Sequence, residues 1–121
     1  MAIPPPLHLN KVLKNRRAED LQSHIIDKEE RRALQQSGLP FATGLTAAFS
    51  VKESLYKALF PQLGQFMDFA DAGIVHCAPE AEQLVLRLNR DFSANFRAGR
   101  EFTGGCRHSP HELLSWVVVP L

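Results

Sequence analysis

The sequence has few of the residues that mark specialised protein classes, and each shortage excludes something. Among its 121 residues are only two cysteines, Cys77 and Cys106, without a CxxC pair, which excludes a disulfide scaffold and a standard zinc cluster. No apolar run approaches the roughly 18 residues that a membrane-spanning helix needs. Residues 1–6 have neither the basic charge nor the apolar core of a signal peptide. We therefore expect a cytoplasmic protein that does not enter a membrane.

Excess charge of one sign is also missing. The 14 basic and 13 acidic side chains leave a formal net charge of +1, so no long-range field attracts nucleic acid or an anionic membrane. With 45% hydrophobic and 22% charged residues, the chain has the composition of an ordinary globular domain and not of a disordered segment. The length predicts a single domain over residues 1–121, with one core.

The first third of the chain contains two periodic segments. Apolar and polar residues alternate over residues 7–13, which predicts a short strand. Residues 1–17 are therefore expected to contain a divergent leader and this first strand. Further along, Asp27 is followed three residues later by Glu30. This spacing is an N-cap signature, and it predicts a helix over residues 28–36.

The remaining two thirds change from helical to strand periodicity. Residues 41–60 carry apolar side chains three and four apart, which predicts a long central helix ended by Pro61 and Gly64. Short β-branched or alternating runs follow, and they predict strands. These runs are residues 72–78, 83–89 and 113–119. Helices followed by strands favour an α+β domain in which the long helix packs across an antiparallel sheet.

Lys52 breaks the pattern of the central helix. On a helical wheel it falls in the middle of the apolar arc, where a lysine is unexpected. Two explanations are open: its stem covers apolar surface while the ammonium reaches solvent, or the ammonium reaches an anion or a carboxylate in a cleft. Glu53 and Lys57 lie beside it at the spacing of an ordinary surface ion pair. The three charges together could instead hold a divalent cation and phosphates.

The same helix carries a motif that resembles the signature of 4'-phosphopantetheinyl transferases. That signature is (W/F)-S-x-K-E-S-x-x-K-A, and residues 49–58 read F-S-V-K-E-S-L-Y-K-A. The flanking residues 25–31, 60–61 and 66–69 are similar to the enterobactin synthase component D (surfactin-type) branch of that superfamily. The resemblance covers residues 18–121. It implies an α+β fold that corresponds to the C-terminal half, a single half of the phosphopantetheinyl transferase fold.

The resemblance also implies an activity and its residues. Members of this family transfer the phosphopantetheine arm of coenzyme A to a serine of an acyl or peptidyl carrier protein, in a reaction that depends on Mg²⁺. By this resemblance Glu53 is a Mg²⁺ ligand and catalytic residue, and Lys52 and Lys57 contact the phosphates of coenzyme A. The resemblance implies a catalytic role for Lys57 as well. Glu30 matches a glutamate discussed as the base for the carrier serine, although it also fits the ordinary acidic first turn of a helix.

The start of the chain departs from the family pattern. The family supplies further metal carboxylates from a G-x-D-x-E strand, where this chain has His8 in place of the aspartate and Asn10 in place of the glutamate. Because Mg²⁺ prefers carboxylate oxygen, a metal site that includes His8 is expected to be weak. The alternative function is a catalytically impaired remnant, or a module of the same fold that binds coenzyme A or the carrier protein.

A second departure concerns architecture. The component D branch has two similar halves in one chain with coenzyme A between them, and this chain resembles the second half only. Other members of the superfamily are single halves that build the cleft between subunits. The resemblance therefore implies either a homo-oligomer or an N-terminal half that is supplied elsewhere.

Two further groups of residues have ordinary interpretations. Cys106, His108 and His111 lack zinc spacing, and we expect a turn near residues 104–105 instead. Several arginines of the second half are expected on a solvated face, unless they meet an acidic helix of a carrier protein. These arginines are Arg87, Arg90, Arg97 and Arg100.

Overall fold

A computed structural model describes residues 7–13, 25–78, 80 and 82–119, with side chains from residue 25 onward. The described elements, in chain order, are β1 (Leu7–Leu13), α3 (Lys28–Gln36), α4 (Phe41–Leu63), the 3₁₀ helix η1 (Phe69–Asp71), β2 (Ala72–Ala78), β3 (Gln83–Leu88), β4 (Glu101–His108) and β5 (Glu112–Val118). They form the α+β fold that the sequence predicts. No helix in the described part of the chain is both long and apolar enough to cross a membrane.

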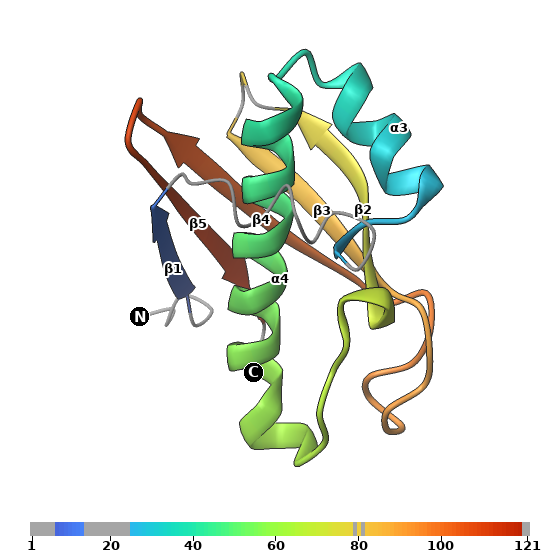
Figure 1. Ribbon diagram of the computed structural model, residues 1–121. Coiled ribbons are helices and arrows are strands. Elements are labelled where there is room, and N and C mark those ends of the chain that lie inside the picture. Colours follow the sequence, from blue (N-terminus) through green and yellow to red (C-terminus); the bar gives the residue numbers. More distant parts are fainter. Residues whose placement is uncertain (1–6, 14–24, 79, 81, 120–121) are drawn as a thin grey trace, which may run out of the picture.

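The five strands form one antiparallel sheet in the order β1-β5-β4-β3-β2. Helix α4 packs on β5, β1 and β4, while α3 packs on β2 at the edge of the sheet. Figure 1 shows α4 crossing the sheet, with α3 beside its first half. The long helix therefore lies across the sheet, as the sequence predicts, and its middle turns lie against the core.

The core lies between α4 and the sheet. Side chains on alternate positions of β3 and β5 are buried, in the period of two that a half-covered strand requires. The buried side chains of these two strands are Leu84, Leu86, Leu88, Leu113, Ser115 and Val117. The apolar ones among them belong to the same core cluster as the apolar face of α4. The buried positions recur about every 2.0 residues in the strands and every 3.6 residues in the helix.

The end of α4 differs from the prediction. The helix does not end before Pro61 but continues through it to Leu63, and Gly64 then ends it with a φ of 61°. Proline removes one helical hydrogen bond, yet the last turn persists because Leu63 packs against the core. The amide of Gly64 donates to the carbonyl oxygen of Phe60 at 2.8 Å, which closes the helix.

The predicted turn at residues 104–105 is wrong. Gly104 and Gly105 lie in the middle of β4, which pairs with β3 on one side and β5 on the other. A side-chain carbon at Gly105 would come 2.6 Å from ring carbon Cζ2 of Trp116. The two glycines therefore serve close approach to the neighbouring strand and do not break the chain. The strand predicted over 83–89 begins as predicted and ends one residue earlier, and the strand predicted over 113–119 begins and ends one residue earlier.

Candidate active site

The motif helix α4 buries a lysine together with its apolar face. Lys52 is 5% exposed and belongs to a face that includes Leu45, Leu55 and Leu59. Escape of its ammonium to solvent, the first explanation offered by the sequence, is wrong. The second explanation was that the ammonium reaches an anion or a carboxylate. It is confirmed for a carboxylate, because the Lys52 ammonium lies 2.9 Å from a carboxylate oxygen of Glu30.

The Lys52 ammonium has protein acceptors from three parts of the chain. It donates to the carbonyl oxygen of Ile25, just before α3, and to that of Phe69 in η1 at 2.8 Å. Its third partner is the Glu30 carboxylate. An ammonium has three N–H donors, and all three are matched by protein oxygens.

The Glu30 carboxylate is equally well matched. Its Oε1 accepts the backbone N–H of Asp27 at 3.2 Å, as part of the capping box that begins α3. Its Oε2 accepts the backbone N–H of Ile74 in β2 at 3.0 Å. Glu30 is 3% exposed. One ion pair therefore joins α3, α4, η1 and β2.

Burial shifts both groups of this pair towards their neutral forms. Burial raises the pKa of the Glu30 carboxyl, opposed by the Lys52 ammonium and by the N–H donors of Ile74 and Asp27. Burial lowers the pKa of the Lys52 ammonium, opposed by the charges of Glu30 and Asp27. A lysine with a carboxylate and two carbonyls around it nevertheless stays compatible with the interior, since its donors are matched.

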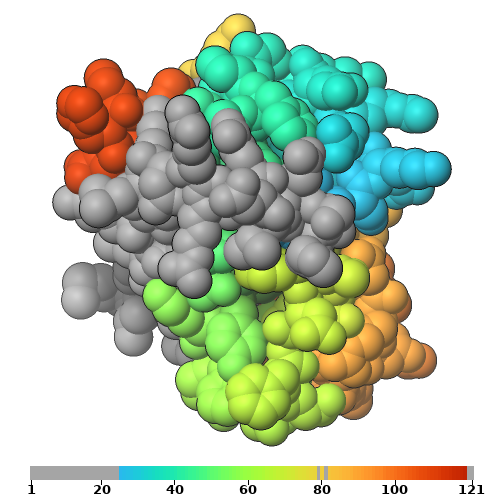
Figure 2. Space-filling model, in the orientation of Figure 1, coloured from blue at the N-terminus to red at the C-terminus, as the bar shows by residue number. Residues whose placement is uncertain are grey.

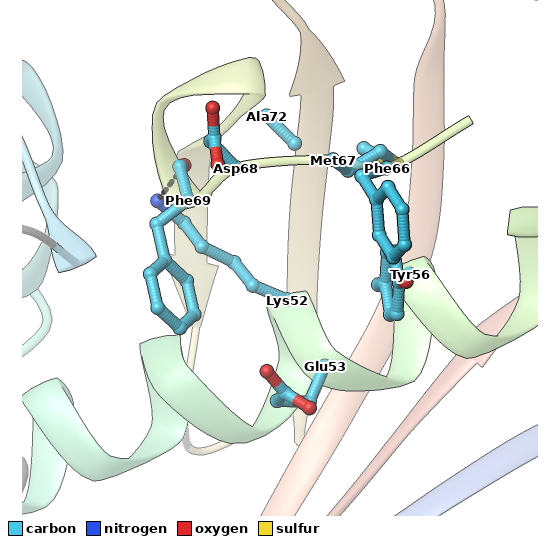
Figure 3. A pocket seen from close by; sticks show the side chains of 8 residues that line it. All are labelled: Lys52, Glu53, Tyr56, Phe66, Met67, Asp68, Phe69 and Ala72. Carbon is cyan, nitrogen blue, oxygen red and sulfur yellow. Dashed lines mark hydrogen bonds between the residues drawn. The ribbon is translucent and has the colours of Figure 1, made fainter.

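A pocket of about 320 Å³ lies between α4 and the segment that follows it. It is lined by Lys52, Glu53, Tyr56, Phe66, Met67, Asp68, Phe69 and Ala72. Figure 3 shows that Lys52 and Glu53 leave α4 in different directions, with Lys52 running to the carbonyl of Phe69. Glu53 is half-buried. The pocket is therefore lined by one buried cation that is already paired and by two carboxylates, those of Glu53 and Asp68.

Aromatic rings extend from the pocket to the surface. The rings of Tyr56 and Phe60 have centroids 5.6 Å apart, and those of Phe60 and Phe66 are 5.7 Å apart. Phe66 is 77% exposed and Phe60 is 39% exposed. This end of the pocket therefore presents apolar surface to solvent, in contrast to the charged end at Lys52 and Glu53.

Arg90 supports the segment that forms the far wall of the pocket. Its Nε lies 3.0 Å from Oδ1 of Asp71, and its Nη2 donates to the carbonyl of Phe66 at 3.3 Å. Its guanidinium carbon also lies 3.9 Å from the centre of the Phe92 ring. Figure 2 shows the β3–β4 loop, in orange, beside the yellow-green segment after α4. Arg90 thus ties that loop to the pocket wall.

Comparison with known proteins decides the family. Residues 8–107 match the model of the 4'-phosphopantetheinyl transferase superfamily, which is most of the chain. The chain belongs to this superfamily.

Individual relatives match a shorter part. The chain is 50% identical over 50 residues to enterobactin synthase component D of Salmonella typhi. It is 48% identical over 52 residues to the protein of the same name from Salmonella typhimurium. The matched residues are 41% and 43% of this chain and 21% and 22% of the two relatives. The chain thus matches about a fifth of the length of these curated relatives.

The structure brings some of the predicted transferase residues together. Glu53 lines the pocket, and Lys57, one turn further along α4, is exposed. Lys52 and Glu30, predicted respectively as a phosphate contact and a base, are bound to each other in the interior. The roles of all four residues stay predictions.

The described residues offer few protein ligands for a magnesium ion. No three histidine, cysteine, aspartate or glutamate side chains gather in the part of the chain that the structure describes. Two carboxylates, of Glu53 and Asp68, line the pocket. Figure 3 shows these two carboxylates on opposite sides of Lys52, so they do not converge on one ion. Because Mg²⁺ can be held by one carboxylate together with substrate phosphates and water, Glu53 alone would suffice as the protein ligand. His8 lies in β1 opposite Val117, but its side chain is outside the described residues.

Sequence reasoning missed the wall of the pocket. The family pattern includes residues 66–69 but gives them no role. The expectation that Arg90 lies on a solvated face is confirmed, because it is exposed, but its contacts with Phe66 and Asp71 were not predicted. The available signal was the run of Phe66, Met67 and Phe69 beyond the helix end, where apolar side chains without clear periodicity can mark a binding surface. No sequence pattern indicates that Arg90 would reach that segment.

Proposed function

We propose that this protein transfers the 4'-phosphopantetheine group of coenzyme A to a serine of an apo acyl or peptidyl carrier protein, in a reaction that depends on Mg²⁺. The observation that carries the proposal is the position of Glu53 at a pocket with Lys57 one turn away on the same helix. The membership of the superfamily supports it, as does the similarity to enterobactin synthase component D. The proposed setting is the cytoplasm.

In the proposed reaction the oxygen of the serine hydroxyl forms a bond to the phosphorus that carries pantetheine, and the hydroxyl proton passes to water. The bond from that phosphorus to the bridging oxygen breaks, and adenosine 3',5'-bisphosphate leaves with the bond's electron pair. Glu53 would hold the magnesium ion, which when bound stabilises negative charge on phosphate oxygens. The ammonium of Lys57, which is an exposed residue, would contact the phosphates and neutralise part of their charge.

A second candidate function is a binding module that keeps affinity for coenzyme A or the carrier protein without transfer. The sequence observation that favours it is the pair His8 and Asn10 at the strand where the family pattern has acids. For either function, the similarity to a half of the two-half branch suggests that a homo-oligomer or a separate N-terminal half completes the cleft.

The test is transfer in a defined mixture. The protein is incubated with coenzyme A, MgCl₂ and several apo carrier proteins, and the carriers are weighed by mass spectrometry. We expect a carrier to gain the mass of phosphopantetheine, and this gain to disappear with EDTA or in Glu53→Gln. A family member of known activity serves as the positive control.

Failure has two distinguishable forms. Binding of coenzyme A, measured by calorimetry, without any transfer would favour the binding module. Neither binding nor transfer, alongside a working control enzyme, would overturn both functions. Light scattering on the same samples shows whether the active species is an oligomer.

A further inference from the structure

The charged pair at the base of the pocket is joined to more elements than a phosphate contact requires. Lys52 is held by the carbonyls of Ile25 and Phe69, while Glu30 is held by the amide of Ile74. These groups belong to the segment before α3, to η1 and to β2, and Lys52 itself belongs to α4. The pair is therefore the point at which the motif helix is fastened to the opposite wall of the pocket.

A phosphate contact by Lys52 would have to replace one of these bonds. Its ammonium has three acceptors in the protein, and the side chain is 5% exposed. If Lys52 turned towards a phosphate, the carboxylate of Glu30 would lose its cation in the interior, where an unpaired charge is costly. Lys57 on the same helix is exposed.

The Lys52–Glu30 pair affects the position of Glu53, because Lys52 and Glu53 are neighbours in the helix. The two residues are adjacent in α4, and the bond from Lys52 to the Phe69 carbonyl spans the pocket wall. Figure 3 shows this bond on one side of the helix and the Glu53 carboxylate on another. Fixing Lys52 therefore fixes the distance from Glu53 to the segment that carries Asp68 and Phe69.

We propose that Lys52 and Glu30 are a positioning pair, which holds the 66–69 wall against α4 and so sets the place of Glu53, and that neither touches the phosphates or the carrier serine. This inference rests on the proposed transfer reaction for its effect on rate. It changes the roles that the family resemblance implies for these two residues.

The test compares Lys52→Met with Lys57→Met, which makes the same change on the exposed side of the same helix. In Lys52→Met we expect kcat to fall about tenfold or more, because small displacements of reacting groups have effects of this size. The KM for coenzyme A should change less than about threefold, since no phosphate contact is lost. In Lys57→Met we expect that KM to rise about tenfold or more.

A second measurement does not depend on activity. Amide hydrogen exchange at Ile74 and Asp27, whose N–H groups are held by Glu30, should become at least about tenfold faster in Lys52→Met and stay unchanged in Lys57→Met. If Lys52→Met fails to fold, the double variant Glu30→Gln/Lys52→Met, which removes both charges, replaces it in all measurements. That variant should show the same split between kcat and KM.

The outcomes separate the two proposals. A rise in the KM for coenzyme A as large in the folded Lys52 variant as in Lys57→Met would overturn the positioning role. Unchanged exchange at Ile74 and Asp27 in Lys52→Met would overturn it as well. Wild-type protein that transfers nothing, while exchange accelerates only in Lys52→Met, would overturn the proposed function and leave the fastening of the wall supported.

Discussion

Two neighbouring positions of α4, Lys52 and Glu53, have opposite surroundings. Lys52 is buried and has a partner for each of its N–H donors, whereas Glu53 is half-buried at the edge of an open pocket. One residue along a helix is a rotation of about 100°, which is enough to pass from the interior to a solvent-facing site. Adjacent residues of one motif can therefore serve different purposes, one in fixing the structure and the other in contacting a ligand.

The largest expected effect on stability comes from breaking the buried side of this comparison. Lys52→Met leaves the Glu30 carboxylate buried without its cation, and loss of one partner of a buried pair costs about 3–5 kcal/mol. Urea unfolding should show a decrease of that size. The same experiment on Lys57→Met, at an exposed position, should show a change within about 0.5 kcal/mol. Equal effects in the two variants would contradict the contrast.

The open side should respond in activity. Glu53→Gln keeps the size of the side chain but removes the charge that the proposed metal requires, so transfer should fall by about 100-fold or more. The free energy of unfolding should change by no more than about 0.5 kcal/mol. Carrier mass spectrometry and urea unfolding measure the two quantities. A variant that keeps full activity would remove Glu53 from the metal role.

The pH dependence of stability sharpens the description of the buried pair. The pKa of Glu30 in the folded state is raised above its ordinary value of 4.5. Between pH 4.5 and this raised pKa the folded state binds more protons than the unfolded state, so the free energy of unfolding falls as the pH rises. The lowered pKa of Lys52 gives the opposite slope towards its ordinary value of 10.5. The nearby charge of Asp27 also acts on Lys52. Asp27 is unchanged in the variant described next, so it is common to both proteins.

The comparison is between wild-type protein and Glu30→Gln/Lys52→Met, by urea unfolding from pH 4 to pH 10. The stability of wild type relative to the variant should decline above about pH 4.5 and recover as the pH approaches 10.5. A difference that is constant over this range would show that the pair has the same protonation in the folded and unfolded states.

The smallest effect is expected at the support of the pocket wall. Arg90→Gln removes a partly exposed ion pair with Asp71 and the contact with the Phe92 ring, together worth about 1 kcal/mol. Transfer should fall only a few-fold. Arg97→Gln is the matched control, because its pair with Asp91 is 3.9 Å long and largely exposed. A larger loss for Arg97 than for Arg90 would contradict the support role.

Much of the fold follows from local patterns. The capping box at Asp27 and Glu30 gave the start of α3, and the alternation over 7–13 gave β1, because both signals act over a few residues. The end of α4 and the two glycines of β4 were mispredicted. In both cases packing against other elements, of Leu63 on the core and of Trp116 on Gly105, overrides the local preference of proline and glycine.

The sequence by itself determined the α+β class, the family motif on the central helix and the anomaly of a lysine within its apolar face. Only the tertiary structure decided that Lys52 binds Glu30, since the partners lie 22 positions apart and on different helices. It also decided the pocket wall at residues 66–69 and its link to Arg90. Local patterns record which face of an element is buried, but the contacts of a buried charge depend on which elements the fold brings together.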